Sequence, residues 1–215
     1  MIEILSPIFK GLMQLTGVLS IGLLLTLSFL DSDVKGGITN IKLVKKTKAF
    51  LLFWLIATFA FVVIQISYLL QQPLASSLDL TVIRSYLTQT AIGKSYVVQI
   101  IGIIILLSIA LRRVITTYLC LLIGLIAIVA PVFQSHGSSS GRHGLAIGAL
   151  VIHVIALSFW VGGLFGLTQL NKEQKLIALP RFSELALWSA ITVVITGAAT
   201  AWTRLDSIEA WQSKY

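Results

Sequence analysis

Six long apolar runs, almost free of charged residues, divide this sequence and constrain its fold more than any other feature. A helix needs about 17–25 residues to cross a hydrocarbon core of roughly 30 Å, and each run is about that long. Strands are excluded because an open sheet edge cannot be left unpaired in lipid. We therefore predict an all-α, polytopic membrane helix bundle of about six transmembrane helices, over approximately Ile8–Leu30, Ala49–Leu70, Ser95–Leu111, Val114–Phe133, Gly144–Leu170 and Glu184–Trp202.

Composition supports the same fold. Hydrophobic residues make up 57% of the chain and charged residues only 11%, whereas soluble domains carry about 25% charged residues. The length fits a single membrane domain over residues 1–215, with the lipid bilayer as its first partner. We expect the first run to be a retained helix rather than a signal peptide, because Ser28-Phe29-Leu30-Asp31 stands where a small-residue cleavage site would follow.

The basic residues predict the orientation of the chain. A net charge of +8 could suggest nucleic acid, but these residues sit between apolar runs, where they orient a membrane protein instead. No nucleic-acid partner is expected. The first, third and fifth loops should be cytoplasmic, with both termini outside, because they hold ten of the sixteen basic residues: Lys35, Lys42, Lys45, Lys46, Lys48, Arg112, Arg113, Lys172, Lys175 and Arg181.

The second loop, residues 71–94, is long for a connection. Leu74, Leu78, Val82 and Tyr86 recur at helical spacing, which favours an amphipathic helix lying on the membrane surface. An irregular loop fits the same short pattern equally well. Both alternatives stay open at this stage.

All three histidines fall within one short stretch. His136 and His143 are separated by a segment rich in glycine and serine, which would let both imidazoles reach one ion. Imidazole suits copper, zinc, nickel and iron. The alternative is that both histidines lie on a wet surface and bind nothing. Met13, near the outer end of the first predicted helix, could add a ligand to this external metal site, although packing is its commoner role.

His153 lies inside a predicted span, about 13 Å from its start at Gly144. An ionisable group near the bilayer midplane is a candidate for function by default. The alternative is a neutral histidine that forms a hydrogen bond across a helix interface. His143 and His153 are ten residues apart, or about 15 Å along a helix, so they cannot share one ion if both are helical. Separate ligand stations are therefore expected, one external and one internal.

Small residues around His153 predict close helix packing. Ala149, His153, Ala156, Trp160 and Gly163 fall on one helical stripe. Glycine pairs spaced four residues apart allow helices to approach closely. The last span carries a polar seam that we expect to pack against the His153 stripe. The glycine pairs are Gly162 with Gly166 and Gly144 with Gly148, and the seam comprises Ser189, Thr192, Thr196 and Thr200 with Gly197 beside it.

Residues 135–137 and 150–164 carry the most specific pattern in the chain. A Ser-His-Gly run followed by a membrane helix reading LH…A…WVGGL resembles the copper resistance protein D (CopD) family. Residues 196–199 are similar to the small-residue stretch in that family's next helix. The resemblance is specific over about 130–202 and topological before that. His136 and His153 match the family's histidines, and Trp160, Gly162 and Gly163 match its packing motif.

The resemblance implies a multi-pass protein of the bacterial plasma (inner) membrane, associated with copper uptake, delivery or resistance. A periplasmic copper-binding protein, a cytochrome oxidase assembly protein or a second copy of the chain would be its partners. Two features depart from the family. The family continues through further helices, so this chain is expected to be a fragment, a short homologue or half of a split pair. It has only two methionines, too few for a methionine-rich Cu(I) pathway.

Three hypotheses about function remain open. The first is a copper-binding protein with stations at His136/His143 and at His153. The second is a b-type haem protein that moves electrons, for which a facing imidazole would have to come from a partner or from His143. The third is an assembly or scaffold subunit whose histidines only pack. An enzyme is the least favoured class, because no Ser-His-Asp set, phosphate loop or paired carboxylate stands out.

Overall fold

The computed structural model describes residues 2–30, 40–109, 111, 114–134 and 143–212, and every regular element within them is helical. Six helical stretches in this part of the chain are long and apolar enough to cross a membrane, so the predicted fold class is confirmed. The elements are α1 (Ile2–Leu25), η1 (Thr26–Leu30), α2 (Ile41–Leu70), α3 (Leu74–Ser77), α4 (Leu80–Gln89), α5 (Ala91–Ser108), α6 (Val114–Val129), η2 (Ala130–Gln134), α7 (His143–Leu157), η3 (Ser158–Gly162), α8 (Gly163–Thr168) and α9 (Lys172–Gln212).

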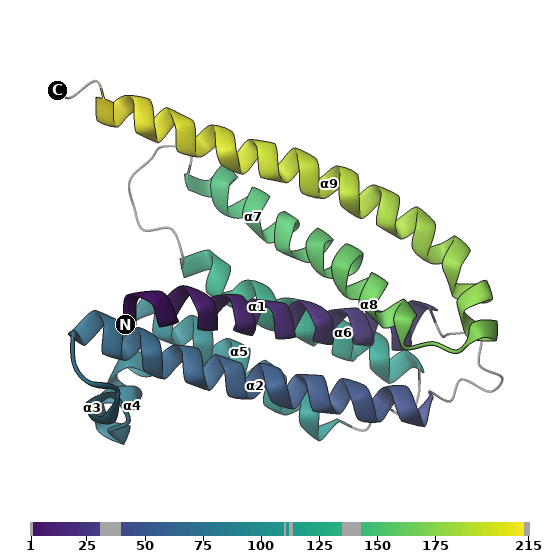
Figure 1. The fold of residues 1–215 in the computed structure, drawn as a ribbon, viewed down its shortest axis with the longest axis horizontal. Helices are drawn as coiled ribbons and strands as arrows, with labels where there is room; N and C mark the ends of the chain where they lie inside the picture. The colour runs from purple at the N-terminus through teal and green to yellow at the C-terminus, as the bar shows by residue number, and fades with distance from the viewer. Residues whose placement is uncertain (1, 31–39, 110, 112–113, 135–142, 213–215) are drawn as a thin grey trace.

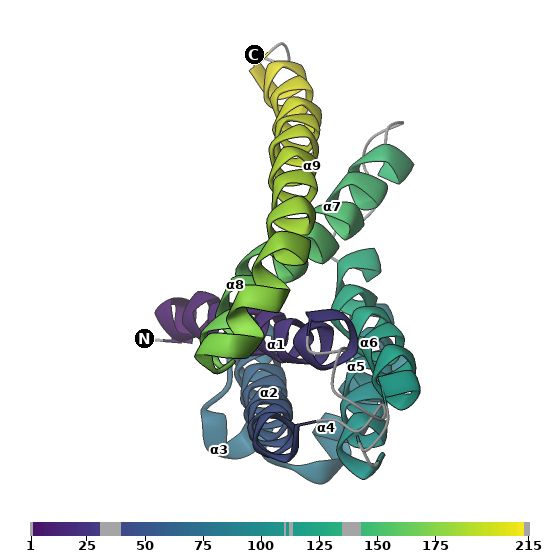
Figure 2. The same cartoon turned by 90° about the vertical axis from the view of Figure 1, so that its right-hand side faces the viewer.

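Helix α1 is the central element of the bundle. It packs against α2, α6, η3 and α8, and 67% of its most apolar window is buried. Helices α1, α2, α5 and α6 form one group, while α7 and α9 lie side by side next to it (Figure 1). Seen from the side, α7 and α9 project away from that group (Figure 2). Only 11% of the apolar window in each of the last two spans is buried, far less than in the first span.

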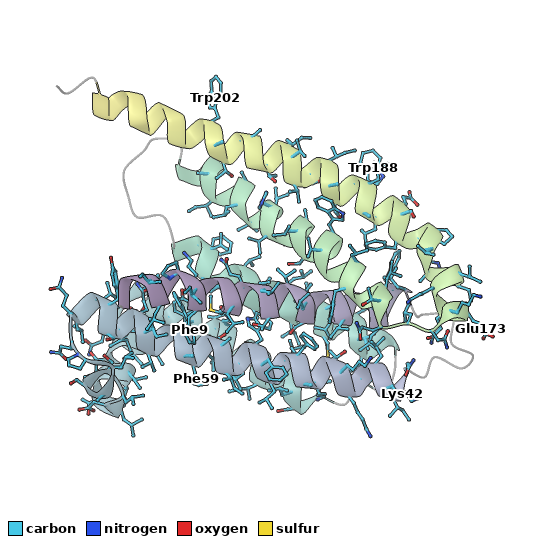
Figure 3. All side chains as sticks on the ribbon, viewed as in Figure 1. Phe9, Lys42, Phe59, Glu173, Trp188 and Trp202 are labelled. Carbon is cyan, nitrogen blue, oxygen red and sulfur yellow. The ribbon has the colours of Figure 1, made fainter. Side chains whose placement is uncertain are left out.

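The chain crosses the bundle in alternating directions. The start of α1 and the end of α9 lie at the same end of the long axis, together with α3 and α4 (Figure 1). Lys42 and Glu173, near the starts of α2 and α9, lie at the opposite end (Figure 3). The starts of α2 and α9, whose basic residues are expected to be cytoplasmic, therefore lie at the same end of the molecule.

Capping side chains fix where several helices begin. The Asn40 side chain accepts hydrogen bonds from the backbone N–H groups of Lys42 and Leu43, and α2 starts there. Asn171 and Gln174 exchange two side-chain-to-backbone bonds at the start of α9, which is a reciprocal cap. Both helices therefore begin well before the predicted spans. Seven basic residues expected in loops lie instead on helix: Lys42, Lys45, Lys46, Lys48, Lys172, Lys175 and Arg181.

Two helices, α3 and α4, occupy most of the second connection, so it is helical rather than irregular, while its position on the membrane surface stays a prediction. The Tyr86 side chain of α4 is buried against the core. Within the described residues, the Tyr86 hydroxyl group is buried without a hydrogen-bond partner. Burial raises the pKa of Tyr86 to about 12, because the charged phenolate would lose its hydration.

Two polar contacts join α2 to α5 within the bundle. Lys48 directs its ammonium group at the last carbonyl groups of α5, 3.2 Å from the oxygen of Leu106 and 2.7 Å from that of Ile109, and also contacts the carbonyl of Leu107. A cation at that position complements the negative end of the helix dipole. Farther along, the Gln99 amide donates to the Thr58 hydroxyl at 2.9 Å.

Candidate metal site at His153

His153 stands in the middle of α7, ten residues after His143. Because one continuous helix contains both residues, their backbones are about 15 Å apart along its axis. The two imidazoles therefore cannot bind one ion together. His136 lies outside the described residues, and so does the side chain of His143.

The His153 ring is tied to α9 by a hydrogen bond. Its Nδ1 atom lies 3.0 Å from the hydroxyl oxygen of Thr196. Gly197 is next to the same edge of the ring, since a Cβ atom added there would lie 3.6 Å from Cε1 of His153. The sequence pattern predicted this packing of the polar seam against the His153 stripe, and the hydrogen bond confirms it.

A cavity of about 330 Å³ lies beside the imidazole. It is lined by Leu150, His153, Gly197, Thr200 and Ala201, so α7 and α9 both contribute to its walls. In the described part of the chain, Nε2 of His153 makes no hydrogen bond. The ring thus has one nitrogen held by Thr196, and it borders the cavity.

The donor set around His153 is sparse. No group of three or more histidine, cysteine or carboxylate side chains that could hold a metal occurs among the described residues. Imidazole is nevertheless a good ligand for copper. An ion at His153 would therefore take its remaining donors from water, from a partner or from segments outside the described residues.

Neither Met13 nor the cysteine Cys120 lies beside His153. Met13 is only 4% exposed and belongs to the apolar core around α1 and α2, so it points into the packed interior rather than toward an external site. A thioether fills irregular gaps in such a core well. Cys120 on α6 is fully buried in the same core.

Gly162 and Gly163 of the WVGGL motif, and Gly166 just after it, lie at close contacts between helices. A Cβ atom added at Gly162 would lie 2.3 Å from the carbonyl oxygen of Val18 on α1. One added at Gly166 would lie 1.9 Å from the Thr26 hydroxyl, and one at Gly163 would lie 2.6 Å from the ring of Phe182. Gly162 and Gly166 let η3 and α8 press against α1 and η1, while Gly163 makes room for Phe182 of α9. The contacts with α1 and η1 anchor the helix carrying His153 to the bundle.

Sequence reasoning missed the partner of this contact, Gly22. A Cβ atom at Gly22 would lie 1.9 Å from the carbonyl oxygen of Gly162, so neither position tolerates a side chain without movement of backbone. No local signal marks Gly22, because no other glycine lies four residues from it. Gly144 and Gly148 differ from this pair, since a Cβ at either would meet no atom within 4 Å.

Trp160 lies apart from the packed glycines. The segment η3 is a π-helical turn, which holds more residues per turn than an α-helix and shifts the face that follows. The expected stripe from Ala149 to Gly163 is therefore interrupted. Gly163 is buried, but the Trp160 side chain remains 38% exposed.

The family model of the copper resistance protein D-like N-terminal domain matches residues 1–145. This match covers 145 of the 215 residues, about two thirds of the chain. The chain belongs to this family. It is a multi-pass membrane protein related to copper resistance. No match was found among curated proteins or among solved structures.

The family match begins earlier in the chain than the resemblance noted from the sequence. It runs from α1 through η2 and ends at the start of α7. The family likeness therefore extends through the first four spans, where inspection of the sequence found only a shared topology. His153, Thr196 and the WVGGL glycines lie beyond the match.

Proposed function

We infer that this chain binds copper within the membrane, with His153 as the internal ligand, and takes part in copper import, delivery or resistance. The observation that carries the proposal is the hydrogen bonding of the two nitrogens of the His153 ring. Its Nδ1 is held by Thr196 at 3.0 Å, and its Nε2 has no hydrogen-bond partner among the described residues. Ligating histidines usually have this arrangement, in which one nitrogen is fixed by a neighbour and the other is free to bind.

Family membership supports copper over the other metals that imidazole accepts. His136 and His143 would form a separate station at the outer face, because His143 and His153 are about 15 Å apart on one helix. Copper captured outside would then pass to His153. The end of the bundle at which Lys42 and the start of α9 lie would face the cytoplasm, and the membrane would be a bacterial plasma membrane.

Partners would supply what the chain lacks. A single imidazole binds an ion weakly, and no cluster of further donors lies among the described residues. A periplasmic copper-binding protein could deliver the ion, and an oxidase assembly protein or a second copy of the chain could complete the site. Copper here is cargo, so binding and transfer rather than catalysis are the proposed activity.

The test is the copper content of the detergent-purified chain from copper-supplemented cells, measured by mass spectrometry. Three variants separate the stations: His153→Ala, the pair His136→Ala with His143→Ala, and all three changes together. Gln65→Ala is the matched control, because it also removes a polar side chain from inside a membrane span. We expect about one copper per chain, retained in the control and reduced in His153→Ala. Copper that persists without the three histidines would refute the proposal.

The haem hypothesis gains no support from the geometry. Axial imidazoles bind the same iron from opposite sides, whereas His143 and His153 are about 15 Å apart on one helix. A Soret band in the purified chain would revive this hypothesis through a histidine from a partner. A chain without copper, in which the histidine variants change only stability, would identify a scaffold subunit instead.

A further inference from the structure

We propose that Thr196 is a positioning residue for His153, holding the imidazole as the Nδ1–H tautomer so that Nε2 carries the lone pair that binds the ion. This inference rests on the proposed function, in which His153 is a copper ligand. It assigns the binding atom and a residue on a second helix that selects it.

The argument begins with the single proton of the Thr196 hydroxyl. Its oxygen lies 2.6 Å from the carbonyl oxygen of Thr192 and 3.3 Å from that of Val193, both on α9. A carbonyl oxygen only accepts hydrogen bonds, so the hydroxyl proton is directed at these two groups. The hydroxyl oxygen is then left to accept a hydrogen bond from another donor.

That donor is Nδ1 of His153, 3.0 Å away. A lone pair on Nδ1 would face the lone pairs of the hydroxyl oxygen and be repelled, so Nδ1 must carry the proton. A neutral imidazole has one N–H group, and the other nitrogen is an acceptor. Nε2 is therefore the atom with a lone pair available to a metal.

These two hydrogen bonds form a chain that ends on a backbone carbonyl group, so it does not depend on a charged side chain. His153 donates to Thr196, and Thr196 donates to Thr192. Each hydrogen bond in such a chain polarises the next, which strengthens the hold of Thr196 on the ring. Gly197 lies next to the same edge of the ring and lines the cavity, where a side chain would project toward Cε1 of His153.

The first measurement is the protonation of the two ring nitrogens in metal-free protein, by nitrogen-15 NMR of histidine-labelled chain in lipid. The chain has only three histidines, so a His153→Gln sample identifies the signals. We expect Nδ1 protonated and Nε2 unprotonated in the neutral ring. Thr196→Ser should keep this pattern, because the hydroxyl remains. Thr196→Val should lose it, because no acceptor remains for Nδ1–H.

The second measurement is the affinity for copper added to the same proteins. Removal of the group that orients a metal-binding histidine typically costs about 10–100-fold in affinity, and we expect this for Thr196→Val. Thr192→Val is the matched control: it removes a hydroxyl of the same seam that donates to Trp188 within α9, and it leaves the Thr192 carbonyl in place. It should change neither the tautomer nor the affinity.

The two readouts separate failure of this inference from failure of the proposed function. A protonated Nε2 in the native chain, or a tautomer unchanged by Thr196→Val, overturns the role of Thr196 whatever the copper content. The expected tautomer together with no copper binding by any version overturns the copper function and leaves Thr196 as the residue that orients His153. Thr196→Ala serves as a second loss-of-hydroxyl variant if Thr196→Val misfolds.

Discussion

Replacing Gly22 by alanine should loosen the attachment of the His153 helix to the bundle. The added Cβ would lie 1.9 Å from the Gly162 carbonyl oxygen and 2.0 Å from its carbonyl carbon. Ordinary contacts of this kind begin near 3.4 Å, so the two segments must separate by about 1.5 Å. The obstacle is backbone on both sides, so no side-chain rotation can relieve it.

The expected cost follows from two opposing terms. Overpacking of this kind costs about 3 kcal/mol, the upper end of the usual range, because backbone must move. Alanine returns about 1 kcal/mol through its higher helix propensity. The net loss of about 2 kcal/mol lowers the ratio of folded to unfolded protein roughly 30-fold.

The assay is reversible unfolding in mixed micelles of SDS and a mild detergent, followed by far-UV circular dichroism. Gly11→Ala is the control, because Gly11 lies on the same helix and a Cβ there meets no atom within 4 Å. It should be neutral or slightly stabilising. The reasoning fails if Gly22→Ala unfolds at the same SDS fraction as Gly11→Ala. Because Gly22 and Gly162 share one contact, the double variant Gly22→Ala with Gly162→Ala should cost less than the sum of the two.

Three further variants test contacts elsewhere in the bundle. Lys48→Met should destabilise the fold by about 1.5–3 kcal/mol in the same unfolding assay, because it removes charge-assisted hydrogen bonds to the end of α5, whereas exposed Lys45→Met should not. Coupling between Gln99→Leu and Thr58→Val should be about 0.6 kcal/mol in a double-mutant cycle, and a value near zero would contradict the observed hydrogen bond. The pKa of Tyr86 is raised to about 12 from 10 for an unperturbed tyrosine, so its contribution to stability is complete below pH 10 and is lost as pH rises to about 12. Tyr86→Phe should therefore weaken the dependence of the unfolding free energy on pH over that interval.

The sequence alone determined the spans, because hydropathy is a local property and the cost of burying charge in lipid is the same whatever the neighbouring helices are. Helix capping is local too, because a capping side chain binds backbone N–H groups two or three residues along the chain. Asn40 and Asn171 cap helices that begin before the apolar runs do. The predicted depth of His153 is local too, since it follows from the number of residues between His153 and the start of its span.

Only the tertiary structure decided which residues meet. Gly22 and Gly162 are 140 positions apart, and nothing near Gly22 distinguishes it from a glycine that contacts lipid. Met13 was predicted as a possible ligand because the sequence of α1 does not show which face of that helix packs into the core. The contact between Thr196 and His153 likewise depends on how α9 packs against α7. The proposed tautomer follows from this contact, because the tautomer of a histidine is set by the hydrogen bond that its ring makes with a neighbour.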